Sequence, residues 1–375
     1  MGVTTRVGLY VAIFFSCLKK GFPLQSLTQK TRSKTKTIVT IQQNISLKPF
    51  NTFGIEAKAK HFVSVSTIDE LKKVLALKNH PNKLILGGGS NMLLTKDYNG
   101  LVIHVMLKGV ELISEDDDFV YIKAYAGEVW HAFVMWCINN NFGGIENLSL
   151  IPGNVGTAPI QNIGAYGVEL KDIFESCEAM SIETTAVKTF SKQECHFDYR
   201  NSVFKQEAKG QFIITSVTFK LTKRNHQLHI NYGTIASQLQ EMQIKNPTIQ
   251  DISKAVIYIR ESKLPNPKVI GNSGSFFKNP IVAKEHYNKL LQNFEDIPCY
   301  PVSNTEVKIP AGWLIEKAGF KGKRFGDYGV HKNQALVLVN YGNAKGSDIL
   351  KLSKLIQTTI ERFFEISIEA EVNIL

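Results

Sequence analysis

Cysteine is scarce in this sequence, and no two cysteines lie close together. Five cysteines occur in 375 residues, and none share the Cys-x-x-Cys spacing. The scatter argues against a zinc site, which needs clustered ligands, and against a disulfide framework. We therefore expect no bound metal and a reducing compartment, with the cytoplasm as the predicted location.

Acidic residues are missing from the first 40 residues, which hold seven lysines and arginines. Subtracting these seven from the formal net charge of +11 leaves about +4 on the rest of the chain. A nucleic-acid-binding protein would need a basic stripe on its folded body, and none is visible there. The mild positive charge suits an anionic small ligand better.

The apolar run at residues 7–17 (VGLYVAIFFSC) is too short to span a bilayer, since a spanning helix needs about 20 residues. No small-residue cleavage site clearly follows it. We interpret residues 1–45 as an N-terminal extension, expected to be disordered and outside the fold. A weak membrane anchor, a targeting peptide and a misassigned start codon remain open explanations, and stable membrane insertion is not expected.

Strand and helix signals alternate in the next part of the chain. Thr67 is expected to start a helix, because Glu70 three residues later completes a capping box. The apolar patterns further predict strands at 61–65, 83–86, 101–105 and 119–124, a helix at 129–138, and antiparallel strands within 172–222.

The pattern becomes rich in helices beyond residue 225, where we place a domain boundary. Helices are predicted at 249–263, 283–293 and 346–364. The sequence therefore predicts an α+β chain with a domain at 46–225, split near residue 105, and a second domain at 226–375.

Two segments contain too much glycine for regular structure. Residues 87–91 (GGGSN), the glycine turn, follow a strand, and successive amides there could form a nest for a phosphate. The turn lacks the Lys-Ser/Thr of a Walker loop and the third glycine of a dinucleotide fingerprint, so a plain hairpin is the alternative. Residues 143–167, the irregular coil, hold six glycines and two prolines. So apolar a coil is expected to line a buried ligand.

The segment 271–280 (GNSGSFFKNP), the serine loop, places one hydroxyl after a run of small and amide residues. Such a run can turn tightly and approach a ligand closely, which would aim Ser275 at a bound anion. A glycine-rich connection between strands explains the same residues equally well.

Several other charged residues each allow two interpretations. Arg200 could bind a carboxylate through two parallel hydrogen bonds, or lie on the surface at a strand end. Arg260 and Lys263 could bind phosphates, or form a solvated helix end. Glu369 and Glu371 could both face solvent, or one could be functional, because a carboxylate among apolar residues is costly unless it is paired.

Eight motifs follow one another along the chain: 51–54 (NTFG), the glycine turn, the irregular coil, 199–205 (YRNSVFK), the serine loop, 311–316 (AGWLIE), 330–337 (VHKNQALV) and 371–372 (EV). Their order resembles the UDP-N-acetylenolpyruvoylglucosamine reductase family over roughly residues 46–375. The segment around Tyr232 looks like the longer subtype, in which a tyrosine loop closes over the substrate.

The resemblance implies an α+β fold with a two-part FAD-binding domain of the vanillyl-alcohol-oxidase type and a C-terminal substrate domain. Residues 366–375 would return to the flavin site. It also implies FAD held without a covalent bond, since Asn91, and not a histidine, follows Ser90. The residues expected to hold FAD are Asn51, Thr52, Gly87, Gly88, Gly89, Ser90, Asn91, Ile151, Gly153, Gly156, Gln161, Asn162, Gly164, Ala165 and Tyr166.

The implied reaction is the NADPH-dependent reduction of UDP-N-acetylenolpyruvoylglucosamine to UDP-N-acetylmuramate, a step in making the peptidoglycan precursor. By match of motif, Arg200, Ser275 and Glu371 are the catalytic residues, with Ser275 as proton donor to an enolate. The residues expected to bind the UDP-sugar are Tyr232, Lys263, Asn279 and Gln334. A monomer is expected.

Two other functions remain possible at this point. Another FAD-linked oxidase could use the same scaffold, and it would not take electrons from NADPH. A flavin-binding or nucleic-acid-binding protein without turnover is the alternative outside enzymes, and the location of the basic charge counts against nucleic acid.

Overall fold

The fold begins with a four-stranded sheet in the order β1-β2-β5-β3. In the computed structural model, which describes residues 39–375, β2 and β3 run parallel to β5, and β1 is the antiparallel edge strand. Helix α1 (Ile68–Leu75) follows β2, and Thr67 and Glu70 form the expected capping box. The strands are β1 (Gln42–Ser46), β2 (Lys58–Val65), β3 (Lys83–Leu86) and β5 (Tyr98–Val105).

The expected N-terminal extension, residues 1–45, lies outside the described residues except for its last part. Residues 39–45 are described, and strand β1 begins at Gln42 and pairs with β2. The folded body therefore starts a few residues before the expected boundary at 46.

A second sheet has five strands in the order β11-β10-β12-β7-β6, and all its pairs are antiparallel. Trp130 and Phe133 of the following helix pack on Phe219 of β12, with ring centroids 5.9 and 4.7 Å apart. The elements are β6 (Val110–Glu115), β7 (Phe119–Tyr125), α2 (Trp130–Asn139), α3 (Leu170–Ile173), β10 (Phe174–Ser181), β11 (Val187–Ser191) and β12 (Phe212–Thr222).

The irregular coil folds as a series of short turns, as its glycines and prolines predict. It is largely buried despite lacking regular structure: Glu146, Asn147 and Leu148 are each at most 1% exposed. The turns and short strands are η2 (Glu146–Leu148), η3 (Val155–Thr157), η4 (Pro159–Gln161), β8 (Gly164–Ala165) and β9 (Val168–Glu169).

Two helices, α4 (Ile235–Glu241) and α5 (Ile249–Lys263), form a small core of their own. Tyr166 of the irregular coil packs against this core, and α5 also contacts η2 and α2. The helices therefore pack on the part of the chain that precedes residue 225, and the division at that residue stays a prediction.

The C-terminal part contains two small sheets and three helices. The sheet orders are β13-β19-β18-β17 and β14-β16-β15. The elements are β13 (Gly271–Ser275), β14 (Ile281–Ala283), α6 (Lys284–Leu291), β15 (Tyr300–Pro301), β16 (Glu306–Lys308), α7 (Ala311–Lys317), β17 (Arg324–Phe325), β18 (Tyr328–Val330), β19 (Val337–Asn340) and α8 (Gly346–Phe364).

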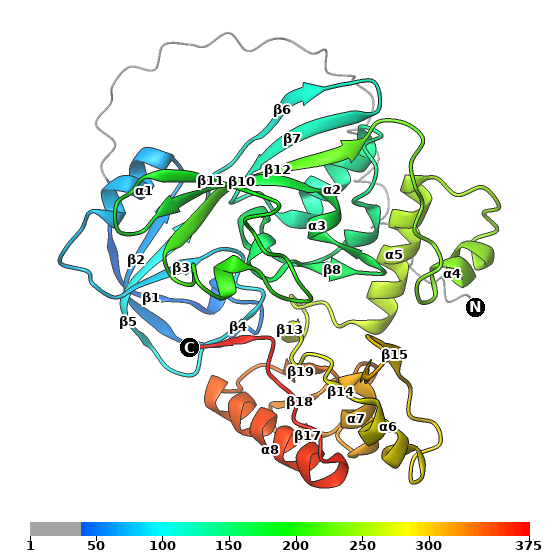
Figure 1. The fold of residues 1–375 in the computed structure, drawn as a ribbon. Helices are drawn as coiled ribbons and strands as arrows, with labels where there is room; N and C mark the ends of the chain where they lie inside the picture. The colour runs from blue at the N-terminus through cyan, green and yellow to red at the C-terminus, as the bar shows by residue number, and fades with distance from the viewer. Residues whose placement is uncertain (1–38) are drawn as a thin grey trace, which may run out of the picture. The chain divides into compact units, whose positions relative to one another are not determined.

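The beginning and the end of the described chain share one hydrophobic core. Phe53 and Leu93 belong to it together with Phe276, Ile315 and Ile356. Strand β20 (Asn373–Ile374) also runs back to pair in parallel with β4 (Met92–Leu93), as Figure 1 shows at the C terminus. The last residues of the chain thus lie directly beside the residues that follow the glycine turn.

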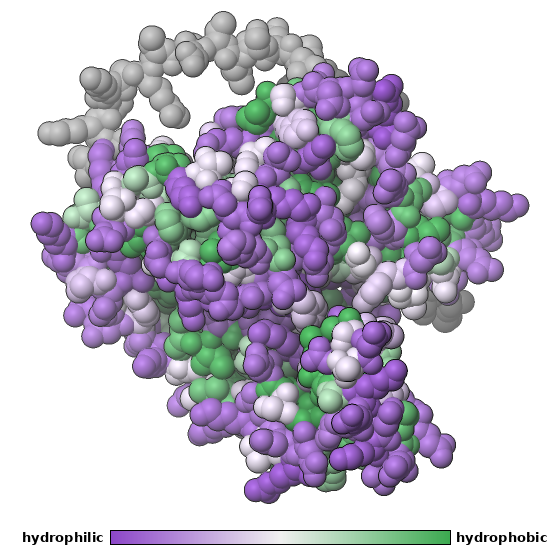
Figure 2. All heavy atoms as spheres, in the orientation of Figure 1, coloured by the Kyte–Doolittle hydropathy of each residue, from purple (hydrophilic) through white to green (hydrophobic). Residues whose placement is uncertain are grey.

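The surface in the view of Figure 2 is mostly hydrophilic, with smaller hydrophobic areas between. No helix within residues 39–375 is both long enough and apolar enough to cross a bilayer.

Candidate flavin and substrate site

The glycine turn and the irregular coil form a single cradle. Gly89 has a φ of +60°, and a Cβ there would collide with the carbonyl oxygen of Phe50. A Cβ on Gly88 would lie 2.7 Å from Asn154 Oδ1 and 2.9 Å from Gly153 Cα. Only glycine fits at these two positions, because the turn packs directly against Phe50, Gly153 and Asn154.

The loop at Asn51 and Thr52 fixes one side of this cradle. The Thr52 amide donates to Gly89 O at 3.1 Å, and its hydroxyl lies 3.4 Å from Ser273 Oγ. The Asn51 side chain donates to Leu47 O and Ile55 O and accepts from the Ile55 amide. Asn51 therefore uses its side chain to hold its own loop, while Thr52 connects the glycine turn to the serine loop.

Some coil residues expected to hold FAD pack closely against the glycine turn or its surroundings. Gly153 has a φ of +110°, and a Cβ there would lie 2.8 Å from Ser90 Oγ. Gly156 packs so tightly on Ala126 that a side chain would collide with it. Ile151 and Ala165 are half-buried against the second core, and Tyr166 has a φ of +52°. Of these residues, Gly153 lies directly beside Ser90 of the glycine turn, and Gly156 packs on Ala126.

Asn91 joins three separate segments. Its side-chain amide donates to Gln161 Oε1 at 2.7 Å and to Glu371 O at 3.4 Å. The carbonyl of Asn91 in turn accepts from the Asn373 amide at 3.1 Å. The glycine turn, the irregular coil and the C-terminal strand are therefore held together at this residue.

Arg200 lies in a left-handed turn with a φ of +53°. Its Nη2 donates to Gly164 O at 2.8 Å, and Lys205 Nζ donates to Arg200 O at 3.0 Å. Asn162, which is fully buried, donates to Asp198 O at 3.1 Å and so supports the same turn. Neighbours on both sides thus hold Arg200 in a conformation that few residues other than glycine adopt.

Arg200 faces Glu371, the second expected catalytic residue. Arg200 Nε lies 3.4 Å from Glu371 Oε1, yet this buried Nε makes no hydrogen bond within residues 39–375. Burial raises the pKa of Glu371, although the charges of Arg200, Lys205 and Lys278 act in the opposite direction. The site therefore holds a buried carboxyl and a guanidinium that still has a donor to offer.

The two glutamates near the C terminus face different environments. Glu369 is exposed and accepts from Lys278 Nζ at 3.0 Å, whereas the Glu371 side chain is only 11% exposed. The solvent-facing alternative therefore holds for Glu369 and fails for Glu371. The C-terminal segment leaves strict alternation where Ala370 bridges to Phe277.

Ser275 ends β13 beside this pair. The register of β13 on β19 shifts between Asn272 and Ser275, and Gly274 has a φ of +70°. The carbonyl of the next residue, Phe276, accepts from the Glu371 amide at 2.8 Å. Ser275 is exposed, and its hydroxyl has no hydrogen-bond partner among the described residues. The serine loop thus carries an exposed hydroxyl one residue before its backbone contact with Glu371.

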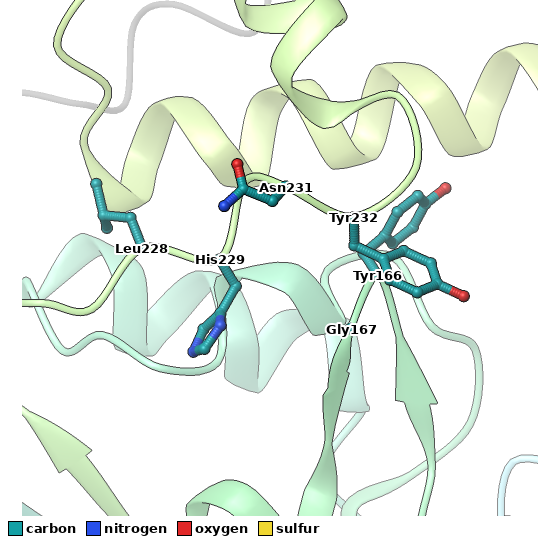
Figure 3. Close-up of a pocket in the computed structure, with 6 residues that line it drawn as sticks. All are labelled: Tyr166, Gly167, Leu228, His229, Asn231 and Tyr232. Atoms are coloured by element: carbon teal, nitrogen blue, oxygen red, sulfur yellow. The ribbon is translucent and has the colours of Figure 1, made fainter. Parts of the chain in front are cut away.

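Tyr232 lies at the edge of a cavity of about 270 Å³ formed with Tyr166, Gly167, Leu228, His229 and Asn231 (Figure 3). Its side chain packs over Gly167, where a Cβ would lie 3.2 Å from Tyr232 Cβ. Tyr232 is 54% exposed. It can therefore meet a ligand entering from solvent.

The other residues expected to bind substrate are more dispersed. Lys263 is exposed at the end of α5. Asn279 Oδ1 accepts from the Ala311 amide at 2.9 Å, which leaves its NH₂ for a ligand. Gln334 Oε1 accepts from the Leu336 amide at 3.2 Å. Asn279 and Gln334 thus hold their own backbone surroundings and retain free donors.

Sequence reasoning left the role of Arg260 open and did not place it among the expected site residues. A solvated helix end was one explanation, but Arg260 Nε is buried and has no partner within the described residues. Burial lowers its pKa, and the neighbouring charges are those of Tyr166 and Arg200. A partly buried guanidinium whose buried Nε lacks a partner indicates an anionic or electron-rich ligand. Its spacing of three from Lys263 was the only sequence signal.

These features fit FAD. The cradle offers backbone donors of the kind that bind phosphates, and Arg260 and Arg200 offer buried donors that lack partners in the chain. FAD carries a pyrophosphate for the first and a polar ring edge for the second.

Comparison with known proteins adds family information. The sequence profile described as UDP-N-acetylenolpyruvoylglucosamine reductase, C-terminal domain, matches residues 266–375, and the profile of an FAD binding domain matches residues 59–189.

Two relatives match nearly throughout. The UDP-N-acetylenolpyruvoylglucosamine reductase of Flavobacterium johnsoniae is 62% identical over 335 residues, which cover 89% of this chain and 99% of that protein. The reductase of the same name from Amoebophilus asiaticus is 47% identical over 337 residues, again 89% of this chain and 99% of that protein.

A solved structure supports the fold. The UDP-N-acetylenolpyruvylglucosamine reductase of Thermus caldophilus aligns with a TM-score of 0.64 at 23% identity, covering 90% of this chain and 99% of that one.

Proposed function

Because the chain belongs to the UDP-N-acetylenolpyruvoylglucosamine reductase family, we propose that Arg200, Ser275 and Glu371 perform the chemistry of that reductase. The expected function is confirmed. The protein is a flavin-dependent oxidoreductase that uses FAD and NADPH to reduce UDP-N-acetylenolpyruvoylglucosamine to UDP-N-acetylmuramate, in peptidoglycan precursor synthesis. The expected α+β fold with an FAD-binding part is confirmed too.

One observation carries the proposed roles. Arg200, held in a left-handed turn, lies 3.4 Å from the buried Glu371, whose backbone is bonded to the residue after Ser275. The contact of Arg200 with Glu371, and the hydrogen bond of the Glu371 amide to the residue after Ser275, support a shared role for a guanidinium, a carboxyl of raised pKa and a hydroxyl from three distant segments.

Each of the three residues would have a separate role in the reaction. Bound FAD supplies the hydride that it receives from NADPH. Arg200 would bind the carboxylate of the enolpyruvyl group and stabilise the negative charge that builds on it. Glu371, whose pKa burial raises, would hold a proton and share it with the same carboxylate. Ser275 would donate its proton to the carbon beside that carboxylate.

The remaining predicted residues would bind and orient. The amides of the glycine turn and of the irregular coil would hold the phosphates of FAD, and Arg260 would contact its ring system. Tyr232, Lys263, Asn279 and Gln334 would hold the UDP-sugar through stacking and hydrogen bonds. We also propose that the protein acts as a monomer in the cytoplasm.

Separate half-reactions test the proposed roles. In the Ser275→Ala variant, FAD should remain bound and NADPH should bleach it at the normal rate under anaerobic conditions. Reoxidation by the enolpyruvyl sugar should slow by about 10²-fold or more, because a positioned proton donor contributes about that much. Stopped-flow absorbance of the flavin measures both steps.

Two results would contradict these assignments. Normal reoxidation of the Ser275→Ala variant would exclude Ser275 as the proton donor. Bleaching of the wild-type protein by a small alcohol, but not by NADPH, would favour the other FAD-linked oxidase.

A further inference from the structure

The segment that carries Tyr232 is attached to the rest of the protein by very little. Leu228 and Ile230 pack against neighbouring cores. Within the part of the chain that the structure describes, residues 227–233 make one hydrogen bond, from Asn147 Nδ2 to His229 O at 2.8 Å. The position of Tyr232 therefore depends strongly on Asn147.

Asn147 itself is fixed in a rigid place. It lies in η2 and is fully buried. Leu148 of the same element is fully buried in the second core, and the element packs against α5 and α2. Asn147 thus binds the sparsely bonded Tyr232 segment from a well-packed element.

The same amide also binds the backbone of Tyr166, another residue that lines the cavity. Asn147 Nδ2 donates to Tyr166 O at 2.9 Å, where Tyr166 has a φ of +52° and the next residue is Gly167. Tyr232 rests on Gly167, and Figure 3 shows Tyr232 above it with His229 further along the same loop. One side chain therefore sets the distance between the coil that would hold FAD and the loop that would hold the substrate.

We propose that Asn147 is a positioning residue that holds Tyr232 in its substrate-binding place by joining the carbonyls of Tyr166 and His229. The inference rests on the proposed role of Tyr232 in binding the UDP-sugar. Asn147 touches neither ligand, and acts only through the two loops.

Leucine has nearly the shape of asparagine but no donor, so Asn147→Leu removes both hydrogen bonds and keeps the packing. Both carbonyls then lose a buried partner, and the Tyr232 segment gains freedom that binding must remove again. The dissociation constant for the UDP-sugar should rise about tenfold. FAD content and the rate of reduction by NADPH should stay within about twofold of the wild type.

A control variant separates positioning from general damage. Ser253→Ala breaks the buried hydrogen bond between α5 and the residue after η2, without touching the Tyr232 segment. It should bind the UDP-sugar normally. In both proteins, titration of the oxidised flavin spectrum with the UDP-sugar gives the dissociation constant.

A double variant tests the route through Tyr232. In the Tyr232→Ala background, Asn147→Leu should weaken binding by less than twofold, because its effect passes through the missing ring. A full tenfold loss in that background would overturn the proposal.

Limited proteolysis gives a readout that needs no activity. Trypsin can cut after Lys223 or Arg224, which precede the segment, and Asn147→Leu should be cut several-fold faster there than Ser253→Ala. Equal cutting and equal binding in the two variants would overturn the proposal. Failure of the wild-type protein to bind the UDP-sugar would instead contradict the proposed function. Faster cutting of Asn147→Leu would, even then, support the proposal that Asn147 holds the Tyr232 segment in place.

Discussion

Arg200 and Glu371 each have a feature that a merely structural residue would not need. Arg200 has a φ of +53°, and Glu371 is a carboxyl with a side chain only 11% exposed. A left-handed conformation of a bulky residue costs about 1–2 kcal/mol. The surrounding hydrogen bonds from Lys205 and to Gly164 offset this strain. Strain held in this way is typical of functional sites.

The raised pKa of Glu371 predicts how its replacement changes stability with pH. A group whose pKa is raised on folding stabilises fully below its unfolded pKa, near the ordinary value of 4.5, and this contribution is lost as the pH rises through the folded pKa. Glu371→Gln should therefore unfold at a higher temperature than the wild type at pH 8, with a smaller difference at pH 5.

Thermal unfolding of the two holoproteins, at constant excess FAD, measures this difference. A variant that is less stable at both pH values would show that the attraction of Arg200 outweighs burial. Turnover should fall in the variant, since Glu371 is proposed to act on the substrate.

Among the elements, local patterns predicted the helices well. The helices expected at 249–263 and 346–364 are α5 and α8 with those bounds, since both have regular apolar spacing and clear ends. The resemblance supplied Arg200, Ser275 and Glu371. Neither source could reveal that the Nε of Arg260 is buried without a partner or that Asn147 joins two loops. The two partners of Asn147, for example, are 19 and 82 positions away from it in the sequence. No local sequence pattern encodes contacts over such separations.

The glycine turn makes an element-scale prediction with a built-in control. Gly89→Ala should destabilise the protein by more than the roughly 1–2 kcal/mol of a left-handed alanine, because its Cβ collides with Phe50 O. FAD should be lost. Gly210→Ala has a similar φ, +73°, and nothing within 4 Å of the added Cβ. It should cost only about 1–2 kcal/mol and keep FAD.

Urea unfolding and the ratio of flavin to protein absorbance after desalting compare the two variants. If both lose FAD to the same extent, backbone strain in general, and not the geometry of the cradle, would explain the loss.

For the whole molecule, every residue proposed for the site lies within 39–375. A chain that begins at Val39 should therefore bind FAD and turn over at rates within about twofold of the full chain. Steady-state oxidation of NADPH in the presence of the UDP-sugar measures this. Loss of FAD from the shortened chain would show that residues 1–38 contribute to the fold.

The core shared by the two ends of the described chain limits how the protein can be divided. Phe53 and Leu93 pack with Phe276 and Ile356, while the second sheet lies between them in sequence. The three residues 116–118 form an exposed turn between β6 and β7. A chain broken there would consist of two pieces that depend on each other like the subunits of an obligate heterodimer. Neither piece should fold or bind FAD unless the other is present.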